Sequence, residues 1–106
     1  MGTIQGELIV HKDETGIEVA VDWAPRHEVI SNQTISSPQI DVLDADGDSS
    51  NHLTVNGLTT SGSQVQFTVD VGGDAVEGAE YELVVWVTLS GGARIYECLT
   101  VTVESC

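Results

Sequence analysis

The residues whose types and spacing most resemble a metal site are three alternating aspartates, Asp44, Asp46 and Asp48. Calcium takes about six to eight oxygen ligands, and alternating aspartates supply the first three in the loop of an EF-hand. That loop needs glycine at its sixth position and a bidentate glutamate at its twelfth, where this chain has Ser49 and Val55. An EF-hand is therefore excluded, and two interpretations stay open: a looser Ca²⁺ site and a solvated acidic turn. We expect no other cofactor.

The chain offers no grouping that would support catalysis. His11, His27 and His52 stand at no ligand spacing and far from any cysteine, and the sequence Gly-x-Ser-x-Gly of a nucleophile elbow is absent. The glycine pairs Gly72-Gly73 and Gly91-Gly92 lack the lysine of a phosphate-binding loop, and each is interpreted as a hairpin turn. With no nucleophile, base and orienting group together, we expect a protein that is not an enzyme and has no catalytic residues.

The charge balance narrows the choice of partners. The chain has 17 Asp and Glu against 3 Lys and Arg, which gives a formal charge of −14. A polyanion is repelled by a phosphate backbone and by anionic lipid, so neither nucleic acid nor a membrane is an expected partner. High charge can also mean disorder, but 41% of the residues are hydrophobic and many of these alternate with polar residues. The pattern predicts a folded domain with its charges on the surface.

Alternation with period two is the signature of half-buried strands, and it continues along most of the chain. It predicts seven strands, at residues 5–11, 16–23, 31–42 with an interruption at Pro38, 52–56, 64–71, 80–89 and 93–103. The turn at residues 13–16 is expected to join the first two strands as a hairpin, and Ser90-Gly91-Gly92 to join the last two. Inward positions include Leu83 and Val85, and acids such as Glu18 and Glu82 fall on outward ones.

Seven short strands without helices or repeats predict one all-β domain over residues 1–106, an immunoglobulin-like antiparallel β-sandwich. One residue adds detail to this fold. Tyr81 follows a glycine-led turn at the start of a strand, as in a tyrosine corner, where the hydroxyl bonds back to the preceding loop. The alternative is that Tyr81 is simply a core aromatic.

A second aromatic group is expected on the outside of the sandwich. Trp86 alternates with inward residues and shares its face with Val84, while Tyr96 and Cys98 lie outward on the next strand and can join them across the hairpin. Such a patch on a small domain is typical of a partner surface, so Trp86, Val84 and Tyr96 are the candidate interface residues. A loop folded over the patch is the alternative.

The cysteines and the first residues bear on localisation. Cys98 lies within a strand and Cys106 ends the chain, a spacing that is awkward for a disulfide along an extended segment, so both are interpreted as free thiols. The first residues include no basic region or long apolar stretch, so we expect no signal peptide and synthesis in a host cytoplasm.

Several short segments resemble those of small immunoglobulin-like virion structural proteins of tailed phages and viruses. They cover about four-fifths of the chain, from Asp22 onward, and comprise Asp22-Trp23, Thr34-Ile35-Ser36-Ser37, Gly57-Leu58-Thr59, Gly72-Gly73 with Gly78-x-x-Tyr81, Thr88-x-x-Gly91, Arg94-x-x-Glu97 and Val101-x-Val103. The resemblance implies a structural accessory of the particle without catalytic residues.

These observations predict a non-enzymatic virion protein, in the first place a capsid-associated accessory or decoration protein. Its expected partners are other virion proteins, either the major capsid protein or a tail or connector protein, and it would form homo-oligomers or lattice-bound copies. The alternatives are a tail or head–tail adaptor component and a surface adhesion or carbohydrate-binding module. The chain contains little lysine and carries a charge of −14, so its surface carboxylates repel one another. Because salt screens this repulsion, the composition further predicts a halophilic host.

Overall fold

The computed structural model describes residues 7–23 and 33–104, and these ranges contain seven strands. The strands are β1 (Glu7–Val10), β2 (Ile17–Asp22), β3 (Ile35–Leu43), β4 (Leu53–Ser61), β5 (Gln64–Val71), β6 (Glu80–Leu89) and β7 (Arg94–Val103). Within the described ranges, no helix is long and apolar enough to cross a membrane.

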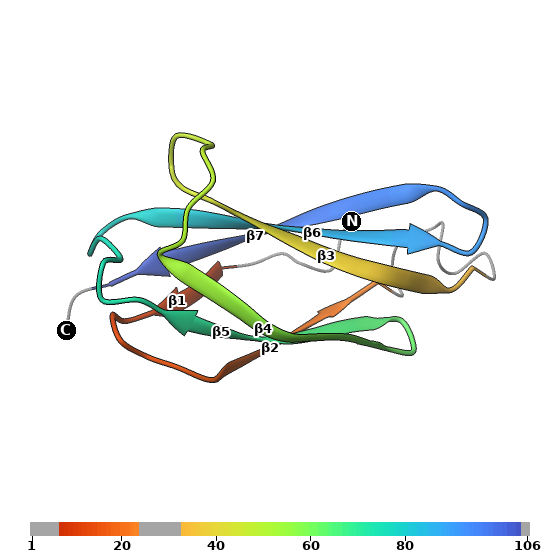
Figure 1. Ribbon diagram of the computed structural model, residues 1–106, viewed down its shortest axis with the longest axis horizontal. Helices are drawn as coiled ribbons and strands as arrows, with labels where there is room; N and C mark the ends of the chain where they lie inside the picture. The colour runs from red at the N-terminus through yellow and green to blue at the C-terminus, as the bar shows by residue number, and fades with distance from the viewer. Residues whose placement is uncertain (1–6, 24–32, 105–106) are drawn as a thin grey trace.

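The strands form two sheets that pack face to face (Figure 1). Sheet A has the order β1-β7-β6-β3, and sheet B has the order β2-β5-β4. Every pairing is antiparallel except that of β1 with β7, which is parallel. The arrangement confirms the predicted immunoglobulin-like β-sandwich of seven strands.

The core lies between the sheets and consists of the inward residues of the alternating strands. Val65, Val69, Leu83, Val85 and Val101 are 0% exposed, and no polar or charged residue is buried in the described part of the chain. The acids placed on outward positions by the sequence therefore do lie at the surface, where a charged carboxylate keeps its hydration. The predicted alternation is confirmed in β5 and most of β7, and in β6 apart from Val84, which is buried although it lies on the outward side.

Two predicted hairpins are wrong. The turn at residues 13–16 does not pair β1 with β2, because β1 pairs with β7 in sheet A and β2 pairs with β5 in sheet B. Similarly, Gly72-Gly73 connects β5 of sheet B to β6 of sheet A. Turn residues mark where the chain changes direction, but they do not specify whether it returns in the same sheet or crosses to the other. The hairpin at Ser90-Gly91-Gly92 is confirmed, with Gly92 at a φ of 99°.

Strands β3 and β4 are the edge strands whose predicted limits differ most from the structure. Pro38 does not divide β3; instead, the pairing with β6 shifts register between Ser36 and Gln39, and Ser37 takes a φ of 51°. An edge strand tolerates proline at such an irregularity because one side of it needs no ladder bonds. Strand β4 runs five residues past the predicted end at Asn56, through a bulge that contains Gly57 at a φ of 66°.

The hydroxyl of Tyr81 forms the predicted tyrosine corner. The backbone N–H of Val76 donates to it over 3.1 Å, and its oxygen also lies 2.7 Å from Nδ1 of His52. The tyrosine ring is 3% exposed, and it meets the His52 ring edge to face with the centroids 5.7 Å apart. One buried hydroxyl thus ties the loop before β6 to the start of β4.

Replacing Tyr81 with phenylalanine should lower the free energy of unfolding by about 1–3 kcal/mol. The ring would still fill its place, but the N–H of Val76 and the ring nitrogen of His52 would lose their shared partner. Denaturant titration of both proteins measures the difference, with Tyr96→Phe at a side chain 51% exposed as the matched control. Equal losses in the two variants would contradict a structural role for the Tyr81 hydroxyl.

Candidate partner-binding face

The outer face of sheet A brings together side chains from three strands. Trp86 in the middle of β6 pairs with Gln39 of β3 on one side and with Tyr96 of β7 on the other. Its neighbours along the strand, Val85 and Val87, point into the core and are 0% exposed. Because successive side chains of a strand alternate between faces, Trp86 points away from the core.

Three contacts organise the side chains around Trp86. The Tyr96 ring lies 4.7 Å from it between centroids and is tilted by 45°, and the guanidinium carbon of Arg94 lies 4.3 Å from the centroid of the Trp86 ring. The indole Nε1–H donates to Oδ2 of Asp41 over 3.2 Å. Nη2 of Arg94 donates to Oε1 of Gln39 over 2.9 Å. We call these five residues, Trp86, Tyr96, Arg94, Gln39 and Asp41, the Trp86 face.

The candidate interface residues differ in how much surface they offer. Tyr96 is 51% exposed and Trp86 is half-buried, whereas Val84 is only 9% exposed although it lies on the outward side of β6. Val84 therefore adds packing under the face rather than contact area. The side chains of Arg94 and Tyr96 cover part of Trp86.

Sequence reasoning missed Arg94, Gln39 and Asp41. Arg94 could have been found, because it lies two residues before Tyr96 and alternation puts both side chains on one face of β7. Gln39 and Asp41 lie 47 and 45 residues before Trp86, so only the pairing register of β3 with β6 brings them to the same face. No local pattern contains that register, least of all next to a bulge.

Cys98 is a free thiol at the surface, on the outward side of β7 opposite Val84. Partial burial raises its pKa above that of an ordinary thiol, and the negative charges of Glu82 and Glu97 raise it further. Both effects disfavour the thiolate. The second predicted free thiol, Cys106, lies outside the described residues.

Alkylation of Cys98 by iodoacetamide at pH 8 should therefore be slower than that of an ordinary exposed thiol, because the thiolate is the reactive form. In a Cys106→Ser background, Glu82→Gln should speed the reaction and shift its pH profile to lower pH, since one of the charges that raise the pKa of Cys98 is gone. Mass spectrometry of timed samples gives the rate. Glu18→Gln on sheet B is the control and should change nothing, and an unshifted profile in Glu82→Gln would contradict the electrostatic cause.

The aspartate-rich loop between β3 and β4 is closed by its own hydrogen bonds. Oδ1 of Asp44 accepts from the backbone N–H of Asp46 over 2.9 Å and from that of Asp48 over 3.0 Å. Asp44 also lines a shallow hollow together with Glu80 and Glu82. No three His, Cys, Asp or Glu side chains meet as a metal-binding group within residues 7–23 and 33–104. Calcium binding at Asp44, Asp46 and Asp48 stays a prediction.

The described histidines take part in structural bonds. His52 contacts the hydroxyl of Tyr81, as described above, and Nδ1 of His11 lies 2.8 Å from the backbone oxygen of Glu104. His27 lies outside the described residues. His11 is bonded to Glu104, just after β7, and His52 to Tyr81 of β6, so the two described rings have different partners.

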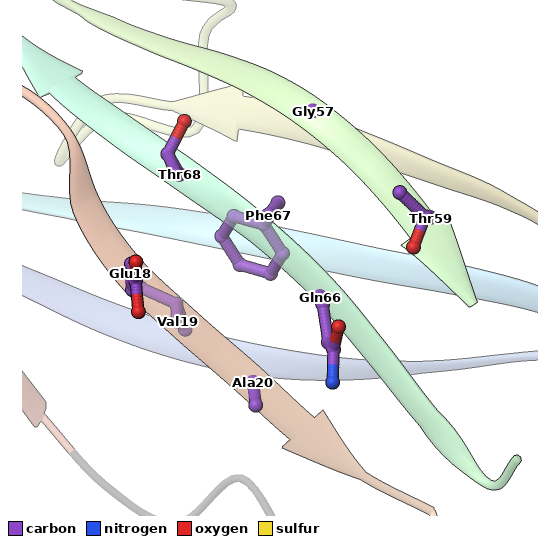
Figure 2. A pocket seen from close by; sticks show the side chains of 8 residues that line it. All are labelled: Glu18, Val19, Ala20, Gly57, Thr59, Gln66, Phe67 and Thr68. Carbon is purple, nitrogen blue, oxygen red and sulfur yellow. The ribbon is translucent and has the colours of Figure 1, made fainter. Parts of the chain in front are cut away.

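The outer face of sheet B carries a broad depression (Figure 2). It is lined by Glu18, Val19, Ala20, Gly57, Thr59, Gln66, Phe67 and Thr68. The small residues Ala20 and Gly57 leave it hollow, while the Phe67 ring is only 3% exposed and belongs to the core. This surface offers polar groups but no exposed ring, whereas central interface contacts are enriched in Trp, Tyr and Arg. The Trp86 face is therefore the stronger candidate.

Comparison with known proteins supports the fold and goes no further. No protein-family model and no curated protein matches the chain. Among solved structures, it is similar to the one titled "Crystal Structure of the Periplasmic Chaperone SfaE", with a TM-score of 0.61 and 8% sequence identity. The match covers 93% of this chain and 54% of that chain, so this chain spans about half the chaperone's length. The chain shares an immunoglobulin-like β-sandwich with that chaperone.

Proposed function

We propose that the protein is a non-enzymatic binding module that contacts a partner protein through the Trp86 face. The observation that carries this proposal is the grouping of a half-buried Trp86, a half-exposed Tyr96 and Arg94 on one rigid sheet. These three residue types dominate binding energy at protein interfaces because each combines a large contact area with a polar group. A sheet face also holds them in place at little entropic cost on binding.

We propose further that the partner is a virion protein and that this chain is a capsid-associated accessory or decoration protein. The segments from Asp22 onward that resemble small virion proteins support this assignment, as does the single immunoglobulin-like sandwich. A particle repeats the same surface many times, so a domain with one modest contact can still attach stably if its copies also touch one another. A tail or head–tail adaptor component is the alternative within the particle.

Density-gradient purification of the particles tests the virion assignment. We expect this chain to co-migrate with the particles and to be released when Trp86→Leu replaces the native chain. Glu18→Gln, on the outer face of sheet B, should remain attached. Particles that lack the chain altogether would remove the virion assignment, whereas Trp86→Leu particles that retain it would remove the Trp86 face as the contact.

A carbohydrate-binding or adhesion module is the second candidate, and the Trp86–Tyr96 pair favours it, since exposed rings can stack on sugars. Two features weigh against it. The rings are tilted by 45° and so form no flat platform, and Arg94 covers one side of the indole. Titration with neutral oligosaccharides, followed by tryptophan fluorescence, should leave the spectrum unchanged; a saturable change that Trp86→Leu abolishes would favour this candidate over the first.

A further inference from the structure

The Trp86 ring already holds a cation. Arg94 places its guanidinium carbon 4.3 Å from the ring centroid, within the distance at which a cation is attracted to the face of an indole. The contact is made by a neighbour on the adjacent strand, with Arg94 opposite Thr88 and Tyr96 opposite Trp86. This geometry shows that the ring accepts a planar guanidinium.

Among the described residues, Arg94 is accompanied on the outward side of sheet A by carboxylates, including those of Asp41 and Glu82. Asp41 bonds the indole N–H through one carboxylate oxygen, and a carboxylate has a second oxygen that can accept from a partner. Glu82 lies on the same outward side of β6 as Trp86 and is close enough to Cys98, opposite Val84, to raise the pKa of its thiol. Arg94 is one of only 3 basic residues in a chain of net charge −14. A positively charged group approaching this face therefore meets both a ring and carboxylates.

The same charges disfavour two other occupants. A second copy of the chain would bring another −14 to the contact, and an acidic partner would face Asp41 and Glu82, with Arg94 as the described basic residue in its favour. Juxtaposed like charges at an interface cost affinity and slow association.

We propose that the Trp86 face binds an arginine-bearing segment of the partner protein and that Arg94 occupies the guanidinium position while the partner is absent. The proposal rests on the proposed function in one respect, that this face is the contact. A partner guanidinium would stack on Trp86 and donate to Asp41, and a planar fork suits both interactions better than a lysine ammonium does.

The direct test uses the intact chain and short capped peptides. We would titrate ¹⁵N-labelled protein with Gly-Ser-Arg-Gly-Ser-Arg-Gly-Ser and with its lysine, glutamine and glutamate counterparts. The indole N–H resonance of Trp86 should move with the arginine peptide, less with the lysine peptide and not with the other two. Trp23 is 0% exposed, so its indole resonance serves as the internal control and should stay in place. Binding should weaken as salt is added.

Substitution of Arg94 distinguishes this proposal from the alternative in which Arg94 itself contacts the ligand. Arg94→Gln removes the internal competitor and should tighten binding of the arginine peptide by roughly 2- to 30-fold, the range of one cation–π contact. Glu82→Gln should weaken binding, and Glu18→Gln, the same charge change on sheet B, should not. Trp86→Leu should abolish binding, with an unshifted Trp23 resonance as evidence that the variant is folded.

Several results would overturn the proposal. Weaker binding by Arg94→Gln would mean that Arg94 itself contacts the ligand, and preference for the glutamate peptide would identify an acidic partner. Sedimentation that shows self-association through the Trp86 face would identify a second copy as the occupant. Failure of the chain to co-purify with particles would remove the virion assignment but would not affect these peptide titrations, so the two proposals fail separately.

Discussion

We expect Leu83→Ala to lower the free energy of unfolding by about 2–5 kcal/mol, the range for leucine truncation in a packed core. Leu83 is 0% exposed in β6, where it pairs with Val42 of β3 and Leu99 of β7. Neighbours on both sides are anchored in the same sheet and cannot collapse into the space left behind. A small domain is stable by only about 5–15 kcal/mol, so the variant should melt at least roughly 8 °C lower.

Denaturant titration measures this loss, with Ile9→Ala as the matched control. Ile9 is also aliphatic and in sheet A, but it is 53% exposed, so its truncation should cost about 0.5 kcal/mol or less. The slope of the transition should stay the same in both variants, because neither changes the surface exposed on unfolding. Similar losses for Leu83→Ala and Ile9→Ala would contradict the assignment of Leu83 to the core.

The second large effect that we expect is a rise in the melting temperature when salt is added. With a charge of −14 and no buried charge among the described residues, the folded chain concentrates carboxylates on its surface. Two like charges 10 Å apart in water repel by about 0.4 kcal/mol, and a handful of such pairs gives about 2 kcal/mol. Salt shortens the Debye length from about 10 Å at 0.1 M to about 3 Å at 1 M, so the melting temperature should rise by roughly 8–16 °C.

Thermal melts in sodium chloride from 0.02 to 1 M at constant pH measure the effect, which should level off once the charges are screened. The double variant Asp46→Asn/Asp48→Asn changes the formal charge from −14 to −12 and should show a shallower dependence. The same pair tests the calcium prediction: at constant ionic strength, calcium should raise the melting temperature of the native chain only. A melting temperature independent of salt would contradict self-repulsion and with it the expectation of a halophilic host.

Local patterns predicted the strands well and their partners poorly. The strand at residues 64–71 was predicted with the limits that the structure has, since Val65, Phe67 and Val69 must all face the core. By contrast, the first two strands were expected to pair with each other. Which strand lies beside another depends on contacts between residues distant in sequence, such as Leu8 with Val101. The same applies to the length of β4, which continues because β5 offers it backbone partners as far as Ser61.

In the candidate interface, too, some features follow from the local sequence and others from the pairing of distant strands. The sequence by itself determined that Trp86 and Tyr96 lie on the outward side of two strands joined by a tight turn, because a two-residue period allows only two faces. Only the tertiary structure decided which residues surround them. Gln39 and Asp41 reach Trp86 because β3 pairs with β6 in a register that is fixed after the shift between Ser36 and Gln39. The tertiary structure also placed the guanidinium of Arg94 over the indole. The face on which a side chain lies is a local property of the strand, whereas its neighbours depend on how distant strands align.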